Sequence, residues 1–294
     1  MRKPTLPLEE LMETGHLACQ GCGATLAMRY VLKALGSNTV INIPACCWAV
    51  IPGVFPYKNL NVPVLFNAFE CSAATASGIR RGFKKKGLDN INVVAFAGDG
   101  GTADIGIQAL SGAADRNEDI FYVCYDNEAY MNTGIQRSGA TPKGAWTTTT
   151  PGGKKNYYEF SPKKNVPMIM IAHKIPYVAT CTVAFPEDLI AKFNRAKKIR
   201  GLKYIHILSP CPPGWRAISE KTIELSRLAV YSQIFPLYEY FDGKFHLQKI
   251  GKKVPVQDYF IHQGRFAHLT SEMIEQIQSE IDANWEWLNS LNAK

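Results

Sequence analysis

The sequence predicts an α/β fold built on a doubly wound, mainly parallel sheet. Residues 93–97 and 120–125 are apolar runs typical of strands that are buried on both faces. A glycine-rich turn and a helical pattern, in which Ile105, Leu110 and Ala113 share one face, separate the two runs. Strand, turn, helix and strand make a βαβ unit, so both strands are expected to end at the same edge of the sheet.

Further elements of the same kind flank this unit. We expect strands at residues 39–43, 62–66, 177–182 and 204–208, the last of which completes the main sheet. We expect helices at residues 8–12, 24–35, 166–173 and 186–199, and another, composed of small residues, that Ser72 caps. The alternation of the two kinds of segment favours a layered α/β domain.

The pattern changes after residue 215. The expected elements are a helix at 222–231, a hairpin within 236–247 that turns at Asp242-Gly243, irregular chain at 254–269 and a terminal amphipathic helix at 272–291. We therefore predict a main α/β domain at residues 1–215 and a C-terminal extension at residues 216–294. The extension is expected to pack on the domain or on a partner chain.

The distribution of charge gives little support to nucleic-acid binding. The 294 residues carry a formal net charge of +8, but no basic cluster is denser than Lys84-Lys85-Lys86. Scattered positive charge keeps a protein soluble and suits acidic partners, such as an acidic electron carrier.

The sequence also favours a cytoplasmic protein that does not enter a membrane. The first residues lack the apolar run of a signal peptide, and no stretch approaches the ~20 apolar residues that a membrane span needs. Eight cysteines without an export signal indicate a reducing compartment, where thiols bind metals or clusters more often than they form disulfides.

Two short polar segments follow the strands of the βαβ unit. Gly98-Asp99-Gly100-Gly101 follows the first strand and Asp126-Asn127 follows the second, and 25 residues separate Gly100 from Asp126. Glycines let a diphosphate approach the backbone, and the helix that begins there offers N–H donors and a favourable dipole. Asp99, Asn127 and a carbonyl just after Asn127 offer oxygen ligands of the kind that Mg²⁺ prefers and shares with phosphates.

This spacing resembles the metal-diphosphate motif of thiamine diphosphate enzymes. A Gly-Asp-Gly tripeptide alone is more often a simple turn, but the paired asparagine and the strand before each segment favour the cofactor. Residues 134–156 form a loop rich in Thr, Gly and Lys that is too long for a simple turn, so an active-site or interface role is expected.

Four cysteines are expected to converge near the same edge of the sheet. Cys19 and Cys22 form a CxxC pair, while Cys46 and Cys211 are distant single cysteines, each in a loop beyond a predicted element. Four thiolates suit one zinc ion or a [4Fe–4S] cluster, and the spacing neither decides between them nor excludes unligated thiols. Cys47 is adjacent to Cys46 and is an alternative ligand. The other cysteines lie in apolar segments, and we expect buried core thiols at Cys71, Cys124 and Cys181.

Five stretches of the chain resemble the β subunits of 2-oxoacid:ferredoxin oxidoreductases, the thiamine-binding subunits of the pyruvate synthase group. They span nearly the whole chain, and their combination is highly specific. The stretches are GHLACQGCGATLAMR, VVAFAGDGGTADIGIQALSGAADR, CYDNEAYMNTGIQRSGATPKGAWTTTTPGGK, YIHILSPCPPGW and VPVQDYFIHQGRFAHL.

The resemblance implies a ligand set. It implies a [4Fe–4S] cluster on Cys19, Cys22, Cys46 and Cys211. The resemblance therefore favours the cluster over zinc. It implies Mg²⁺ on Asp99, Asn127 and the carbonyl of Ala129. It places Asn132 near the thiazolium and the substrate. The other motif residues that the thiamine diphosphate would contact are Gly98, Gly100, Gly101, Thr102 and Thr133.

The resemblance also implies the reaction and the partners. Such enzymes decarboxylate a small 2-oxoacid oxidatively through thiamine diphosphate, and the electrons leave through the cluster to ferredoxin-like (γ/δ) subunits and to ferredoxin. Coenzyme A takes the acyl group when the substrate is pyruvate-like. The partner α subunit supplies the glutamate for the aminopyrimidine and most substrate contacts, so the chain is expected to be active only within a hetero-oligomer.

One departure from the family pattern concerns the substrate. Similar members continue the third cysteine with Leu-Glu and small residues, where this chain has Cys47-Trp48. The change is expected to put a bulky indole close to the cofactor pocket. A 2-oxoacid that is smaller or more polar than pyruvate, oxalate included, is therefore open, and oxalate would need no coenzyme A.

Two other functions fit parts of the sequence. A non-redox thiamine diphosphate decarboxylase or synthase would share the Asp99 and Asn127 site, but it has no use for four converging cysteines. A zinc-stabilised basic module for a polyanion would use the cysteines and the positive charge, but it has no use for the diphosphate motif.

Overall fold

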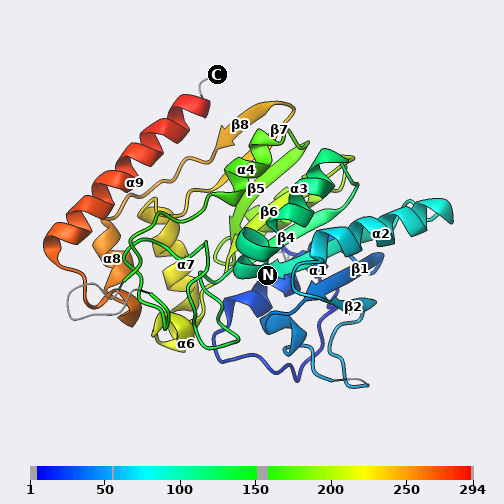
Figure 1. Ribbon diagram of the computed structural model, residues 1–294, viewed down its shortest axis with the longest axis horizontal. Coiled ribbons are helices and arrows are strands. Elements are labelled where there is room, and N and C mark those ends of the chain that lie inside the picture. The colour runs from blue at the N-terminus through cyan, green and yellow to red at the C-terminus, as the bar shows by residue number, and fades with distance from the viewer. Residues whose placement is uncertain (1–4, 55, 151–157, 293–294) are drawn as a thin grey trace.

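The structure is a computed structural model that describes residues 5–54, 56–150 and 158–292. Figure 1 shows a central twisted sheet with helices packed on its faces and a long terminal helix at one side. Within the described residues, every helix is too short or too polar to cross a bilayer.

The sheet has eight strands in the order β2-β1-β3-β4-β6-β5-β7-β8. The strands from β2 to β5 in this order pair in parallel, and β7 and β8 are antiparallel. Their bounds are β1 (Thr39–Pro44), β2 (Val64–Asn67), β3 (Asn92–Gly98), β4 (Phe121–Asp126), β5 (Tyr177–Thr182), β6 (Lys203–Leu208), β7 (Tyr238–Phe241) and β8 (Lys244–Leu247). Gly98 of β3 pairs with Tyr125 of β4, so both strands end at the same edge, as the βαβ unit predicts.

Helices cover both faces of the sheet. The helices of the described residues are α1 (Gly23–Leu35), α2 (Ser72–Lys85), α3 (Ile107–Asp115), α4 (Val166–Ala172), α5 (Pro186–Ala196), α6 (Pro212–Trp215), α7 (Thr222–Tyr231), α8 (Val256–Phe260) and α9 (Ser271–Asn292). One apolar core contains side chains of α1 and α5, and a second contains side chains of α2, α3 and α4. The predicted doubly wound architecture is therefore confirmed.

The C-terminal region joins this architecture instead of standing beside it. The predicted hairpin is confirmed as β7 and β8, but it pairs with β5 and extends the main sheet, so the strand expected to complete the sheet, β6, is not its edge. α7, α8 and α9 surround a third core that includes Trp215, Phe266 and Ile281. The division at residue 215 stays a prediction.

Five local expectations differ from the structure. Ser72 does not cap α2, because it is the first residue of that helix, whose N-cap is Cys71 and makes no side-chain capping hydrogen bond. The helix expected at residues 8–12 is wrong, because this segment is extended and pairs with residues 59–61. Ile105 is exposed, because a π-helical turn, η2 (Gly101–Ile105), precedes α3 and shifts its register. The segment at 254–269, expected to be irregular, contains α8. Cys71 is only half-buried, whereas Cys124 and Cys181 are buried as expected.

The loop predicted at residues 134–156 is partly described. Residues 134–150 contain no helix or strand, as expected, and residues 151–156 lie outside the described residues. The described part returns to the sheet edge, where Ser138 contacts Asp99. This contact supports a role for the loop near the predicted cofactor site.

Candidate active site

A cavity of about 270 Å³ opens where β3 and β4 end. Both predicted segments line it, one after each strand, together with the loop after β1. The lining residues are Ala45, Cys46, Cys47, Ala49, Phe69, Gly98, Asp99, Gly100, Gly101, Tyr125, Asn127, Ala129, Tyr130, Met131, Asn132 and Thr133. The structure thus brings together every predicted cofactor residue except Thr102, which is buried beneath the turn and donates to the carbonyl of Gly98.

The glycines of the turn let two aromatic rings pack so closely that a side chain there would meet them. A Cβ atom at Gly100 would lie 2.3 Å from the ring of Tyr130, and one at Gly101 would lie 3.3 Å from the ring of Phe69. Gly100 and Gly101 also begin the η2 turn, whose N–H groups are without helical partners. The N–H groups at this turn are therefore donors of the kind that bind a diphosphate.

Three oxygen atoms of the two segments face one another at this end of the cavity. The side-chain oxygen of Asn127 faces only acceptors, 2.9 Å from the carbonyl of Ala129 and 2.9 Å from Asp99 Oδ1. An amide turned by half a rotation would donate to both oxygens, but a cation between the three also accounts for the arrangement. Two Mg²⁺ ligands at right angles, each at about 2.1 Å, lie about 2.9 Å apart, so the residues fit a magnesium ion.

The electrostatics of Asp99 also fit a cation site. Asp99 is 1% exposed, and its Oδ2 accepts a 2.6 Å hydrogen bond from Ser138 Oγ. Burial, followed by the negative charge of Asp126, raises the pKa of Asp99 well above its ordinary value. A divalent cation beside the carboxylate reverses this effect, because it stabilises the ionised form.

The cysteines divide into two neighbourhoods. Burial raises the pKa of the Cys47 thiol, and the thiols of Cys211, Cys46 and Cys22 raise it further. Cys211, whose pKa burial raises to about 12, also interacts with Cys22 and Cys19. Cys46 instead contacts Tyr125 and the backbone of Gly98, next to the cofactor cavity. Cys47 is therefore close enough to Cys22 and Cys211 to interact with them electrostatically, and Cys211 interacts in turn with Cys22 and Cys19.

These thiols are not arranged for a single ion. Among the residues that the structure describes, no three His, Cys, Asp or Glu side chains are close enough to hold one metal. One tetrahedral zinc ion needs its thiolates within about 2.3 Å of a common centre. A [4Fe–4S] cluster places a group of iron and sulfide atoms between the thiolates, so wider spacing suits it.

Trp48 does not lie where the sequence places it. Its indole is fully buried, donates to the carbonyl of Ala24 at 3.2 Å and meets Phe96 edge to face. It is not among the residues that line the cofactor cavity. The expectation of an indole close to the cofactor pocket is therefore wrong, because in the short 3₁₀ turn η1 (Cys47–Ala49) the residues on either side of Trp48 line the cavity while Trp48 is buried in the core.

Several residues around the site carry no local signal in the sequence. Ser138 bonds Asp99, Trp215 Nε1 donates to the carbonyl of Asn127 at 2.8 Å, and Arg265 pairs with Glu128. Each contact joins segments that are distant along the chain, so no motif or periodicity predicts it. The stretches that resemble the oxidoreductase family do include all of these residues.

Comparisons with known proteins identify the family of the chain. Residues 51–207 match the family described as the thiamine pyrophosphate enzyme, C-terminal TPP binding domain. The ketoisovalerate oxidoreductase subunit VorB of Pyrococcus abyssi is 52% identical, over 99% of this chain and 96% of that protein. The pyruvate synthase subunit PorB of Methanothermobacter thermautotrophicus is 51% identical, over 95% of this chain and 97% of that protein.

A solved structure is similar in fold. A chain of the 2-oxoglutarate:ferredoxin oxidoreductase from Magnetococcus marinus superposes with a TM-score of 0.58 at 22% identity, over 76% of this chain and 81% of that chain. The similarity to the relatives extends over nearly the whole sequence. This chain therefore belongs to the β subunits of the thiamine diphosphate-dependent 2-oxoacid:ferredoxin oxidoreductases.

Proposed function

We propose that this chain is the β subunit of an enzyme that oxidatively decarboxylates a small aliphatic 2-oxoacid and passes the electrons to ferredoxin. The observation that carries the proposal is the meeting of the Asp99 carboxylate, the Asn127 amide and the Ala129 carbonyl at the glycine turn. This arrangement supports a Mg²⁺ ion that holds a diphosphate group.

Each residue of the cavity has a defined part in this proposal. Asp99, Asn127 and the carbonyl of Ala129 bind the ion, and the backbone of Gly98–Gly101 lies against the diphosphate. Asn132 and Thr133 line the same cavity and are assigned to the reacting end of the cofactor and to the substrate. Thiamine diphosphate, when bound, supplies the electron sink for the decarboxylation, and the chain positions it and excludes water.

The substrate is proposed to be pyruvate or its branched homologue 3-methyl-2-oxobutanoate (ketoisovalerate). Relatives named for either acid are about equally similar to this chain. Phe69 and Met131 give the cavity apolar walls that suit an aliphatic side chain. Oxalate is not proposed, because the reason to expect it was an indole close to the cofactor pocket, and Trp48 lies in the core. With either aliphatic acid, coenzyme A is the acceptor of the acyl group.

A [4Fe–4S] cluster is proposed on four cysteines, with Cys47 in place of Cys46. The electrostatic coupling of Cys47 to Cys22 and Cys211, and of Cys211 to Cys19, supports this set. Cys47 also lines the cofactor cavity, so the cluster lies next to the reacting centre. That proximity suits removal of electrons one at a time, and it separates this proposal from a non-redox decarboxylase or a zinc module.

The partners are proposed to be an α subunit, ferredoxin-like subunits and ferredoxin, within a cytoplasmic hetero-oligomer. The relatives are named as subunits of larger enzymes, which supports an assembly of this kind. The free thiols of the chain support a reducing compartment.

The test is dye reduction by the anaerobically purified complex with pyruvate, 3-methyl-2-oxobutanoate or oxalate, each with and without coenzyme A. We expect turnover of an aliphatic acid that depends on coenzyme A and thiamine diphosphate, and four iron atoms in this subunit. Turnover of oxalate alone contradicts the assigned substrate. Protein without iron that still decarboxylates contradicts the redox function.

A further inference from the structure

The metal-binding loop makes an unusual backbone turn between two of the proposed Mg²⁺ ligands. Glu128, which lies between Asn127 and Ala129, has a φ of +70°, where residues other than glycine are uncommon. Asn127 and Ala129 line the cofactor cavity, whereas Glu128 lines a second cavity on the other side of the loop. The turn therefore directs the two ligands toward the cofactor cavity and the Glu128 side chain toward the second cavity.

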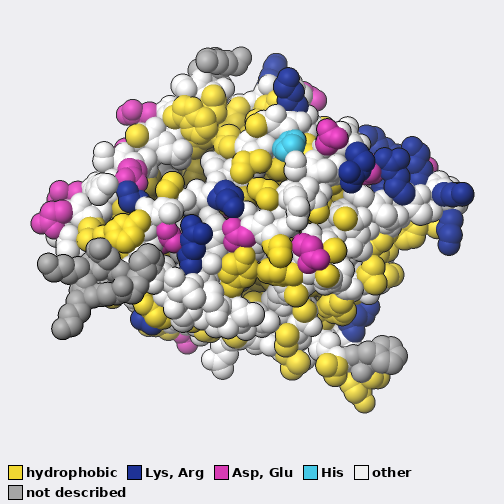
Figure 2. All heavy atoms as spheres, in the orientation of Figure 1, with side chains coloured by type: hydrophobic (Ala, Val, Ile, Leu, Met, Phe, Trp, Pro, Cys, Tyr) yellow, Lys and Arg dark blue, Asp and Glu magenta, His cyan; other side chains and the backbone are white. Residues whose placement is uncertain are grey.

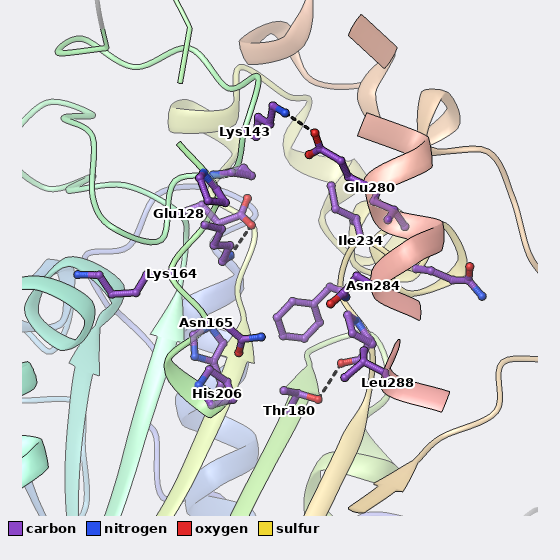
Figure 3. A pocket seen from close by; sticks show the side chains of 18 of the residues that line it. Glu128, Lys143, Lys164, Asn165, Thr180, His206, Ile234, Glu280, Asn284 and Leu288 are labelled. Atoms are coloured by element: carbon purple, nitrogen blue, oxygen red, sulfur yellow. Dashed lines mark hydrogen bonds and ion pairs between the residues drawn. The ribbon is translucent and has the colours of Figure 1, made fainter. Parts of the chain in front are cut away.

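The second cavity shows how Glu128 is held. Figure 3 looks into this space, with Glu128 and His206 on the sheet side and Glu280, Asn284 and Leu288 of α9 opposite. The Glu128 carboxylate is buried, and Lys163 Nζ donates to its Oε1 at 2.7 Å. Lys163 also pairs with Asp126 at 2.5 Å, so one lysine ties the strand end to the turn that follows it.

The other carboxylate oxygen of Glu128 is held from the C-terminal region. Arg265, 137 positions later in the chain, donates to Oε2 at 2.6 Å. Arg265 is 2% exposed, and Gln263 accepts from its Nε at 2.9 Å. A buried guanidinium is tolerated only when it is paired and hydrogen-bonded, so the position of Arg265 and that of Glu128 depend on each other.

Arg265 also acts, through Trp215, on Asn127, the proposed ligand that precedes Glu128 in the sequence. Its guanidinium lies 3.9 Å from the ring centre of Trp215, and the Nε1 of that indole donates to the backbone carbonyl of Asn127 at 2.8 Å. One side chain thus contacts both groups that fix the loop, the Glu128 carboxylate directly and the Asn127 carbonyl through Trp215. Trp215 belongs to α6, which follows Cys211.

We infer that Arg265 and Glu128 are positioning residues for the magnesium site: their buried ion pair holds residue 128 in its left-handed conformation and thereby presents Asn127 and Ala129 to the ion. The inference rests on the proposed magnesium and thiamine diphosphate function. It assigns the C-terminal region a role in cofactor binding. The sequence gives no sign of this role, because the region is far along the chain from the diphosphate motif. Residues that orient metal ligands in this way affect metal affinity by about 10- to 100-fold.

Arg265→Lys tests the inference with a matched control. Lysine keeps the charge but loses the planar fork and the stacking on Trp215. Arg216→Lys is the control, because Arg216 also stacks on a tryptophan, 3.6 Å from the ring centre of Trp146, but it is exposed and lies outside the metal loop. Calorimetry of the purified complex measures thiamine diphosphate affinity across a Mg²⁺ titration. We expect at least about a tenfold loss for Arg265→Lys and none for Arg216→Lys.

A second series at residue 128 keeps the inference testable if Arg265→Lys does not fold. Glu128→Gln keeps the size and loses the charge, Glu128→Ala loses the anchor in a strained conformation, and Glu128→Gly loses the anchor without the strain. We expect all three variants to bind Mg²⁺ more weakly than the unmodified complex. Glu128→Ala is expected to bind it most weakly of the three. Higher Mg²⁺ is expected to restore turnover in Glu128→Gln, which a merely structural defect would not allow.

The two residues are expected to act as a unit. Adding Arg265→Lys to Glu128→Gln should weaken Mg²⁺ binding little beyond Glu128→Gln alone, because each change breaks the same pair. Unchanged Mg²⁺ affinity in Glu128→Gln, or a lowered melting temperature without a change in affinity, overturns the inference. Absence of Mg²⁺-dependent cofactor binding in the unmodified complex instead overturns the proposed function, so the two failures are distinguishable.

Discussion

At the scale of single residues, the site brings a buried carboxylate, a side-chain amide and a backbone carbonyl together at one end of the cavity. The Asn127 amide lies 2.9 Å from Asp99 Oδ1 and 2.9 Å from the carbonyl of Ala129, and burial, followed by the negative charge of Asp126, raises the pKa of the Asp99 carboxyl. A cation would stabilise this arrangement further, because it is attracted to the carboxylate and to the amide and carbonyl oxygens. The chemistry of these residues therefore supports the metal before any cofactor is considered.

Asp99→Asn is expected to weaken Mg²⁺-dependent binding of thiamine diphosphate by more than about tenfold, or ~1.4 kcal/mol. The amide keeps the shape of the side chain but removes the negative charge that attracts the ion. Asp115→Asn, at an exposed position near the end of α3, is the control and should have no effect. Equal affinities in calorimetry for both variants and the unmodified complex would refute the magnesium role of Asp99.

Cys47→Ser and Cys46→Ser form a matched pair for the cluster. Cys47 lies with Cys22 and Cys211, whereas Cys46 contacts Tyr125 at the cofactor cavity. We expect Cys47→Ser to lose or convert the four-iron cluster and Cys46→Ser to retain it. Electron paramagnetic resonance of the reduced, anaerobic protein gives the answer, and the reverse pattern would restore Cys46 as the ligand.

At the scale of elements, the start of α1 and the end of β6 approach so closely that only glycine fits between them. The N–H of Gly23 donates to the carbonyl of Pro210 at 2.9 Å. A Cβ atom at Gly23 would lie 2.7 Å from the Pro210 nitrogen. Cys22 precedes Gly23 and Cys211 follows Pro210, so this contact fixes the separation of two proposed cluster ligands.

Gly23→Ala is therefore expected to separate Cys22 from Cys211 and to lower the iron content, with a loss of stability of about 1–3 kcal/mol. Gly82→Ala in α2 is the control, since no atom lies within 4 Å of its added Cβ and alanine favours a helix. Iron analysis and thermal unfolding measure both effects. A full cluster in Gly23→Ala would show that the close approach is not needed for ligation.

At the scale of the whole molecule, ion pairs connect the elements that meet at the sheet edge opposite the site. Asp119, before β4, pairs with Lys203 at 2.5 Å, Arg200 at 2.9 Å and Arg80 of α2 at 3.1 Å. Burial alone would raise the pKa of Asp119, but the positive charge of Lys203 and the two guanidinium groups lower it below its ordinary value. Figure 2 shows another group of Lys and Arg side chains over the end of α2, in keeping with a surface whose positive charge is spread out.

The lowered pKa of Asp119 predicts a pH dependence. A folded-state pKa below the unfolded value contributes stability that is present above the unfolded pKa and is lost as the pH falls through the folded one. Asp119→Asn should therefore be less stable than the unmodified chain at pH 7, with a smaller difference near pH 3. Urea unfolding at the two values checks this, and a difference that does not depend on pH would contradict it.

Local patterns in the sequence determined the architecture and the location of the site. Buried strands read as apolar runs, and parallel strands must end at a common edge, so the segments at Gly98–Gly101 and Asp126-Asn127 had to meet there. The sequence also separated the core thiols Cys124 and Cys181 from those in loops. These conclusions depend only on periodicity and on chain direction, which neighbouring residues express.

The tertiary structure decided what neighbouring residues do not express. Cys46 and Cys47 have the same chemistry and adjacent positions, and both line the cofactor cavity, but the course of the backbone brings Cys46 to Tyr125 and Cys47 towards Cys211. Trp48 turned into the core by the same geometry. The pairing of Arg265 with Glu128 spans 137 positions. Such contacts follow from the packing of the whole chain, because their energy depends on burial and distance in space and leaves no period in the sequence.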